Sequence, residues 1–304
     1  VTTVVAVKRP AIPADINSYD GRGGATWLDW RTAEAVAVPA EAVPMRSDDP
    51  LYVLYTSGTT GAPKGIVRDQ GGHAVAMTWS MRNVYGAGPG DVFWAASDVG
   101  WVVGHSYIVY GPLLAGATTL IYEGKPVGTP DAGAFWRVVE EHGVNVLFTA
   151  PTSYRTLAAR GPELRRTELR KCVSAGEALP ASTRALWKEA TGIELIDGIG
   201  ATEMLHIFIS HDEAGARPGA TGKVVRGYQA RVIDDDGREV PPGTIGKLAV
   251  KGPTGCRYLA DERQRVYVRD GWNVTGDAYL MDEDGYYFYQ ARTDDMIISA
   301  GYNI

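Results

Sequence analysis

Residues 55–65 are the part of the sequence whose residue types point most directly to chemistry, because they read YTSGTTGAPKG and follow an apolar run. Glycine lets backbone N–H groups come close to a polyphosphate, and Lys64 adds a positive charge. The spacing does not fit the phosphate loop G-x-x-x-x-G-K-[ST]. The segment therefore predicts phosphate contact by a different glycine-rich loop. Further hydrogen bonds can come from the hydroxyls of Thr56, Ser57, Thr59 and Thr60.

Four further short motifs follow in chain order. They are GEALP at 176–180, DGIGATE at 197–203, TGD at 275–277 and RTDDMI at 292–297. Carboxylates such as theirs suit a hard cation like Mg²⁺ and also a ribose diol, because a carboxylate accepts two hydrogen bonds. Each motif alone is compatible with a structural turn or a surface charge. The order of the whole set is what makes it specific.

The five motifs together resemble those of the AMP-forming acyl-CoA synthetase, adenylation-domain and luciferase superfamily, and the likeness covers nearly the whole chain. Residues 63–148 are most similar to acetyl- and propionyl-CoA synthetases. The second half is more similar to benzoate-type ligases, above all 2-aminobenzoate–CoA ligase, on the runs 197–208 and 252–258. The resemblance implies the large N-terminal domain of the adenylate-forming fold, truncated.

The resemblance also implies roles for individual residues around ATP. Thr202 would contact the phosphates, and Glu203 would hold Mg²⁺, with Lys64 as the third catalytic residue. Asp277 would accept hydrogen bonds from the ribose hydroxyls, with Arg292 nearby. The other nucleotide contacts would come from Thr56, Ser57, Gly58, Thr59, Thr60, Gly61, Gly176, Glu177, Ala178, Asp197, Gly198 and Ile199.

The implied reaction joins a small carboxylic acid to coenzyme A and uses ATP with Mg²⁺. The carboxylate attacks the α-phosphate, pyrophosphate leaves, and the thiol of coenzyme A then displaces AMP from the acyl-adenylate. Such a site positions reactants and offsets negative charge, so neither Cys172 nor Cys256 is needed as a nucleophile. His105 lies in an apolar stretch and is more typical of a core residue than of a general base.

Gly200 bears on which acid is used. Short-chain members of the family place a tryptophan at this position, where its ring closes the acyl pocket. Glycine leaves that space open, so Gly200 would line, with Trp101, Val102 and Val103, a site for a benzoate- or 2-aminobenzoate-type acid. The alternative is that Gly200 is only a tight-turn residue and another side chain fills the gap. The chain would then be a short-chain acetyl- or propionyl-CoA synthetase.

The pattern of elements predicts an α/β fold. Apolar runs at 92–95, 117–122, 144–149, 171–174 and 194–197 alternate with helical patterns at 72–85, 132–142, 153–160 and 181–191. This alternation indicates a mainly parallel sheet with helices. After about residue 215, short β-runs and turn signals favour a β-barrel-like lobe. They lie at 222–233, 245–251, 272–275 and 286–291.

We therefore expect a partial N-terminal segment at 1–50, an α/β subdomain that binds nucleotide and acyl group at 51–210, and a β-rich subdomain at 211–293. A hinge at 294–304 would pivot at Asp294. The family's C-terminal domain and its catalytic lysine are absent from the chain, so we expect weak nucleotide binding and poor or no catalysis. A carrier-protein-loading adenylation domain and a non-catalytic nucleotide-binding module stay open as alternatives.

Composition narrows the class of protein further. The 304 residues carry a net charge of −6, which makes the chain a poor general binder of nucleic acid. Two cysteines make no disulfide framework or zinc motif. No apolar run reaches the roughly 18 residues that a membrane span needs, and the N-terminus does not read as a signal peptide. We expect a soluble cytoplasmic protein. Its oligomeric state is not predicted.

Overall fold

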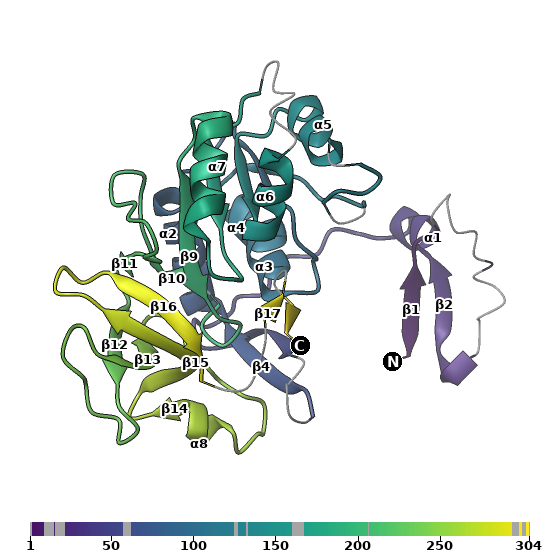
Figure 1. The fold of residues 1–304 in the computed structure, drawn as a ribbon. Coiled ribbons are helices and arrows are strands. Elements are labelled where there is room, and N and C mark those ends of the chain that lie inside the picture. Colours follow the sequence, from purple (N-terminus) through teal and green to yellow (C-terminus); the bar gives the residue numbers. More distant parts are fainter. Residues whose placement is uncertain are drawn as a thin grey trace. The chain divides into compact units, whose positions relative to one another are not determined.

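The computed structural model describes residues 2–8, 15, 22–56, 62–124, 127–131, 133–159, 167–205, 207–293, 298–299 and 302–303. The chain divides into two compact units, Val1–Met45 and Arg46–Ile304. The elements of both are labelled in Figure 1. Among the described residues, none of the helices combines the length and apolar character that crossing a membrane requires. The subdomain limits expected from the sequence stay a prediction.

The described part of the first unit contains two strands and two short helical segments. Strand β1 (Thr3–Ala6) pairs in parallel with β2 (Thr26–Asp29). A 3-10 turn, η2 (Arg22–Gly24), precedes β2, and helix α1 (Trp30–Ala35) follows it. The Asp29 carboxylate accepts a hydrogen bond of 3.0 Å from the N–H of Arg31 and so caps α1. The sequence analysis expected only a partial N-terminal segment here and predicted neither β2 nor α1.

The second unit contains a mainly parallel sheet, as the sequence predicted. Its strand order is β11-β10-β9-β8-β7-β5-β6. The neighbours from β9 to β6 pair in parallel, whereas β10 and β11 are antiparallel. The strands are β5 (Val92–Ala95), β6 (Thr118–Thr119), β7 (Val146–Thr149), β8 (Lys171–Ser174), β9 (Leu195–Gly200), β10 (Ile207–Ser210) and β11 (Lys223–Val224).

Helices cover both faces of this sheet because its strands are apolar on both sides. Phe93 packs into a core with α2 (Gln70–Asn83) and the π-helical turn η3 (His105–Tyr110), whereas the next residue, Trp94, packs into the opposite core. Val146 and Leu147 alternate in the same way. The other helices are α3 (Val102–Gly104), α4 (Gly111–Leu114), α5 (Ala134–Glu141), α6 (Pro151–Ala158) and α7 (Ala181–Thr191). Figure 1 shows α6 and α7 side by side.

The β-rich lobe is a five-stranded antiparallel sheet around β15. β13 pairs with one edge of β15, and β14 and β16 share its other edge, so the ladder of the described strands stays open. A separate hairpin joins β3 to β4, and a second one joins β17 to β18. The elements are β3 (Pro50–Thr56), β4 (Lys64–Asp69), β12 (Gln229–Ile233), β13 (Ile245–Lys251), α8 (Gln264–Tyr267), β14 (Val268–Arg269), β15 (Trp272–Met281), β16 (Tyr287–Arg292), β17 (Ile298–Ser299) and β18 (Tyr302–Asn303).

Trp187 tests how much one helix contributes to the stability of the second unit. Its indole is fully buried on α7, stacked 5.5 Å from the Trp136 ring and edge to face 4.7 Å from the Tyr154 ring. Trp187→Ala should lower the free energy of unfolding by about 3–5 kcal/mol. The measurement is urea unfolding followed by far-UV circular dichroism. Leu186→Ala, at the half-exposed neighbouring position, is the control, and equal midpoints for both variants would contradict the prediction.

Candidate active site

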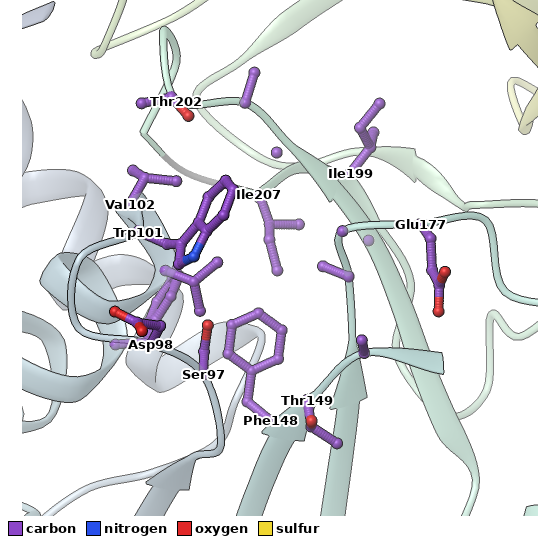
Figure 2. A pocket seen from close by; sticks show the side chains of 18 of the residues that line it. Ser97, Asp98, Trp101, Val102, Phe148, Thr149, Glu177, Ile199, Thr202 and Ile207 are labelled. Atoms are coloured by element: carbon purple, nitrogen blue, oxygen red, sulfur yellow. The ribbon is translucent and has the colours of Figure 1, made fainter. Parts of the chain in front are cut away.

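A cavity of about 810 Å³ opens at the carboxyl ends of the parallel strands. This is the edge where open α/β sheets bind ligands. Its walls include Ser97 after β5, Ala150 after β7 and Gly176 after β8, together with the end of β9 and the turn that follows it. Lys64 from β4 and Asp277 from β15 complete it. Figure 2 shows part of this lining, with Trp101 and Phe148 near its centre.

All the site residues that the sequence analysis singled out, where the structure describes them, line this one cavity. They are Thr56, Lys64, Trp101, Val102, Val103, Gly176, Glu177, Ala178, Asp197, Gly198, Ile199, Gly200, Thr202, Glu203, Asp277 and Arg292. The others lie outside the described residues: Ser57, Gly58, Thr59, Thr60, Gly61 and the hinge residue Asp294. The cavity thus brings together residues that are more than 200 positions apart in sequence. Their individual roles stay a prediction.

Lys64 and Glu203 lie next to each other in the cavity wall. Lys64 begins β4, so the end of the glycine-rich segment is a strand and not a helix. The Lys64 Nζ lies 3.7 Å from Oε1 of Glu203, and both side chains are mostly buried. The Tyr258 hydroxyl donates a hydrogen bond of 2.8 Å to the same oxygen. A cation and a carboxylate therefore stand side by side where a polyphosphate and its counter-ion would need them.

Asp277 and Arg292 form a cross-strand pair between β15 and β16. The Arg292 Nη1 donates to Oδ1 of Asp277 over 3.1 Å. Gly276 permits this approach, since a Cβ built there would lie 2.3 Å from Nη2 of Arg292. The Thr-Gly-Asp motif is thus the middle of a long strand, whereas the sequence predicted a strand only over 272–275. The glycine keeps the arginine against the sheet beside the carboxylate.

Glu177 has its carboxylate at the start of α6. The side chain lies beside the β8–α7 turn, and its Oε1 accepts hydrogen bonds from the N–H of Thr152, at 2.9 Å, and from the Thr152 hydroxyl. This supplies a cap for a helix whose own N-cap residue, Ala150, provides no side-chain hydrogen bond. The Glu177 side chain thereby fixes the turn at 176–178 against the next loop. It shapes the part of the cavity wall that the resemblance assigns to nucleotide contact.

Asp197 is a buried carboxyl group in the wall of the cavity. Its main chain is held by β10 and the residue after it, because the Asp197 N–H donates to Nε2 of His211 over 3.0 Å and Ser210 Oγ donates to the Asp197 carbonyl over 2.6 Å. Its Oδ1 has no hydrogen-bond partner in the described part of the chain. Desolvation by burial raises the pKa of this carboxyl to about 8. The Asp197 carboxyl can therefore accept a hydrogen bond from a ligand, or donate one when it is protonated.

The apolar end of the cavity includes the four predicted acyl-site residues and several others that the sequence analysis missed. Figure 2 shows the Trp101 indole, the Phe148 ring and Ile207 around one space. Phe148 and Ile207 read from sequence only as core residues of strands, and nothing in their local pattern marks them as lining a site. His105 is half-buried, and its ring lies 5.2 Å from that of Tyr52, outside the described cavity lining.

A family model described as AMP-binding enzyme matches residues 3–258. The chain belongs to this family. The resemblance drawn from the five motifs is thereby confirmed, and so is the adenylate-forming fold, since the solved structures named below share it over almost all of the chain. The family match covers most of the chain, including the cavity-lining residues from Leu54 to Thr221.

Curated proteins similar to this chain share about 40% of its residues. An uncharacterised Pseudomonas aeruginosa protein is 44% identical over 99% of the chain and 50% of its own length. The mitochondrial acyl-CoA synthetase short-chain family member 3 of Mus musculus is 43% identical over 91% of the chain and 43% of its own length. The chain thus spans about half the length of the curated relatives it matches.

Solved structures similar to this chain include two ligases for aromatic acids. The anthranilate CoA ligase AuaEII, in complex with anthranoyl-AMP, has a TM-score of 0.85 and 32% identity, with 100% of this chain and 57% of that one covered. A benzoate CoA ligase from Burkholderia xenovorans LB400 has a TM-score of 0.81 and 28% identity, with 98% and 61% covered. The relatives found by sequence are thus named for short-chain acids, whereas these two structural neighbours are named for aromatic acids.

Asp197 predicts a pH dependence of stability. Its pKa is raised from 3.8 to about 8 in the folded chain, so between these values the folded state binds the extra proton. Stability from this group therefore falls as pH rises, by about 1.4 kcal/mol per pH unit. Asp197→Asn should lose this slope. Its free energy of unfolding relative to the wild type should thus rise by about 2 kcal/mol between pH 5.5 and 7.5, measured by urea titration.

The control for Asp197→Asn is Asp270→Asn, at an exposed turn position after β14. Its difference from the wild type should be the same at both pH values. If Asp197→Asn behaves in the same way as this control, the carboxyl at 197 is not held in its neutral form.

Lys64→Ala should weaken ATP binding by about tenfold or more, because a charge-assisted contact to phosphate is lost. Its effect on folding should be smaller, because the Glu203 carboxylate keeps its hydrogen bond from the Tyr258 hydroxyl when Lys64 is removed. The measurements are a calorimetric ATP titration and a thermal melt. Lys247→Ala, which removes the surface partner of Asp235, is the matched control and should leave ATP affinity alone. An unchanged ATP affinity in Lys64→Ala would contradict the predicted role.

Proposed function

We propose that the chain is the ATP- and acid-binding part of an AMP-forming acid–CoA ligase. The observation that carries the proposal is one cavity with two ends of different character. The polar end holds the Lys64–Glu203 and Asp277–Arg292 pairs, and the apolar end holds Trp101 and Phe148. A triphosphate nucleotide and an acid with an apolar body need these two ends joined, so that the carboxylate can reach the α-phosphate.

In this proposal the residues position reactants and offset charge. A carboxylate oxygen forms a bond to the α-phosphorus, and the bond to the bridging oxygen of pyrophosphate breaks. Lys64 offsets the charge on the phosphates, and Asp277 accepts hydrogen bonds from the ribose hydroxyls. In a second step the thiol of coenzyme A attacks the acyl carbon, loses its proton and releases AMP. Neither step uses a nucleophile of the protein.

The carboxylate of Glu203 fits the Mg²⁺ that accompanies ATP in this family. In the described part of the chain no three His, Cys, Asp or Glu side chains come together as a metal site, so the protein by itself offers no cage. Mg²⁺ typically binds through one or two carboxylates together with substrate phosphates. Glu203 would hold it at the cavity wall, and the ion would neutralise phosphate charge there.

We propose an aromatic carboxylate, of the benzoate or 2-aminobenzoate type, as the acid. Gly200 contributes no side chain to the apolar end, while Trp101 and Phe148 offer flat surfaces there. A carboxylic acid with a planar aromatic ring is suited to such a space. The likeness to the anthranilate and benzoate CoA ligases supports this choice.

A short-chain acid is the second candidate. The relatives that support it are the short-chain family member 3 proteins and an acetyl-coenzyme A synthetase 2 of Pseudomonas aeruginosa, 37% identical over the chain. Some of the former are named as mitochondrial, and a cytoplasmic location of the present chain stays a prediction. The non-catalytic nucleotide-binding module and the carrier-protein-loading domain remain as alternatives, and the next experiment separates the first of them from an adenylate-forming enzyme.

ATP–pyrophosphate exchange over an acid panel tests this function. Acetate, propionate, benzoate and 2-aminobenzoate are each supplied to the chain and to the chain extended by a C-terminal domain of the family. We expect exchange that depends on an aromatic acid. Gly200→Trp should reduce exchange with aromatic acids by about tenfold or more and leave ATP affinity unchanged, because the indole fills the acyl space alone.

Each outcome of this assay has a separate meaning. ATP binding without exchange for any acid, even in the extended protein, contradicts the ligase proposal and favours the binding module. Exchange with acetate or propionate alone favours the short-chain candidate. A Gly200→Trp variant with the acid preference of the wild type contradicts the assignment of Gly200 to the acyl wall.

A further inference from the structure

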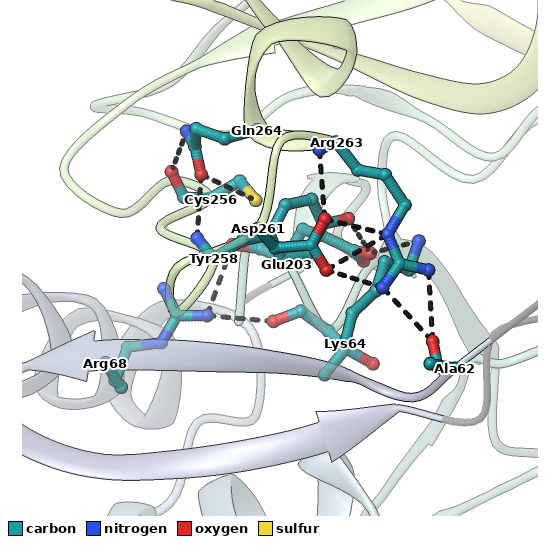
Figure 3. A network of polar contacts seen from close by, with 10 residues as sticks. Ala62, Lys64, Arg68, Glu203, Cys256, Tyr258, Asp261, Arg263 and Gln264 are labelled. Carbon is teal, nitrogen blue, oxygen red and sulfur yellow. Dashed lines mark hydrogen bonds and ion pairs between the residues drawn. The ribbon is translucent and has the colours of Figure 1, made fainter.

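One segment of the β-rich lobe reaches across to the hairpin β3–β4 and ends beside Glu203. The N–H of Val67 donates to the carbonyl of Arg257 over 2.8 Å, and the N–H of Leu259 donates to that of Gly65 over 2.8 Å. Residues 257–259 thus lie along β4 as a short additional strand. Tyr258, at the centre of this pairing, is 7% exposed. Figure 3 shows its place between the lobe and the cavity residues.

The main chain and ring of Tyr258 are held in place by contacts within the β-rich lobe. Its N–H donates to Oε1 of Gln264 over 2.7 Å, and Nε2 of that glutamine donates to the carbonyl of Cys256 over 3.0 Å. Its ring packs edge to face against Tyr267 at 5.9 Å. The hydroxyl then donates to Oε1 of Glu203 over 2.8 Å.

The main chain at Glu203 is held by a different residue, Arg68. This guanidinium is 2% exposed. Its Nη2 donates to the carbonyls of Thr202 and Glu203, at 2.8 Å and 3.2 Å, and its Nη1 donates to the carbonyl of Gly255 at 3.2 Å. The turn therefore does not need Tyr258 to keep its backbone in place. What Tyr258 fixes is the orientation of the carboxylate.

We propose that Tyr258 is a positioning residue for Glu203: its hydroxyl holds Oε1 and leaves Oε2 directed to the cation that enters with ATP. The inference rests on the proposed function and extends it to a residue of the lobe. Within the described residues, Oε1 accepts the Tyr258 hydrogen bond and lies 3.7 Å from Nζ of Lys64, and Oε2 accepts no hydrogen bond. Tyr258 acts through Glu203 and does not itself contact ATP.

Tyr258→Phe tests the proposal, because it removes the hydroxyl and keeps the ring that packs on Tyr267 and lies 5.2 Å from Nζ of Lys64. ATP binding to the chain is measured by calorimetry with Mg²⁺ and with a chelator. We expect the variant to lose about tenfold in affinity with Mg²⁺ and to keep the wild-type affinity without it. Half-saturation of the Mg²⁺ effect should move to higher Mg²⁺ concentration.

Two further variants separate positioning from a structural role. Tyr267→Phe, which keeps the ring packing against Tyr258, should leave the Mg²⁺ effect at its wild-type size. In a Glu203→Gln background, Tyr258→Phe should change the Mg²⁺ effect no further, because the carboxylate that it orients is gone. A purely structural role would instead lower ATP affinity equally with and without Mg²⁺ and lower the melting temperature.

The outcomes also distinguish this inference from the proposed function. A wild-type chain whose ATP binding is not strengthened by Mg²⁺ overturns the positioning role and the assignment of Mg²⁺ to Glu203, whereas the ligase proposal itself is decided by the exchange assay. A wild type with a clear Mg²⁺ effect that Tyr258→Phe fully retains overturns the positioning role alone and leaves the ligase proposal standing.

Discussion

The buried guanidinium of Arg68 is the interaction on which the rest of the site depends. A cation that is 2% exposed is costly unless its donors are paired. The carbonyls that pair it belong to Thr202, Glu203 and Gly255, which come from the turn after β9 and from the β-rich lobe. The hydrogen bonds from Nη1 and Nη2 of Arg68 therefore join three parts of the second unit. Thr202 and Glu203, whose carbonyls they hold, line the cavity.

The parallel sheet supplies the second constraint. Because successive residues of β5, β7, β8 and β9 pack into opposite cores, neither face of the sheet is free to bind a ligand. The polar and conformationally permissive residues are left at the carboxyl ends of the strands, such as Ser97, Gly176 and Thr202. Lys64 and Asp277 reach this edge from the antiparallel parts of the chain. The site is thus built at an edge of one sheet and closed by residues of others.

Much of the fold follows from local pattern. Helix α7 has the predicted limits, since Gly192, with φ of +74°, ends it in the left-handed conformation. The strand β13 also has its predicted limits. The prediction failed where pairing is long-range. β4 was missed because Lys64–Asp69 carries charges at both ends, and only tertiary packing buries Ile66, Val67 and Arg68. The run at 117–122 gives just two strand residues, because only Thr118 and Thr119 find a partner in β5.

The sequence by itself determined the chemistry of the candidate site: a glycine-rich segment with Lys64, the carboxylates Glu203 and Asp277, and an open position at Gly200. These follow from residue types and from the order of short motifs, which do not depend on distance in space. Tertiary structure alone decided which side chains meet. The contact of Tyr258 with Glu203, the carbonyls around Arg68 and the part of Phe148 and Ile207 in the apolar wall join segments far apart in the chain. Local sequence carries no signal for them, because each contact is specified by the packing of both partners and by neither one alone.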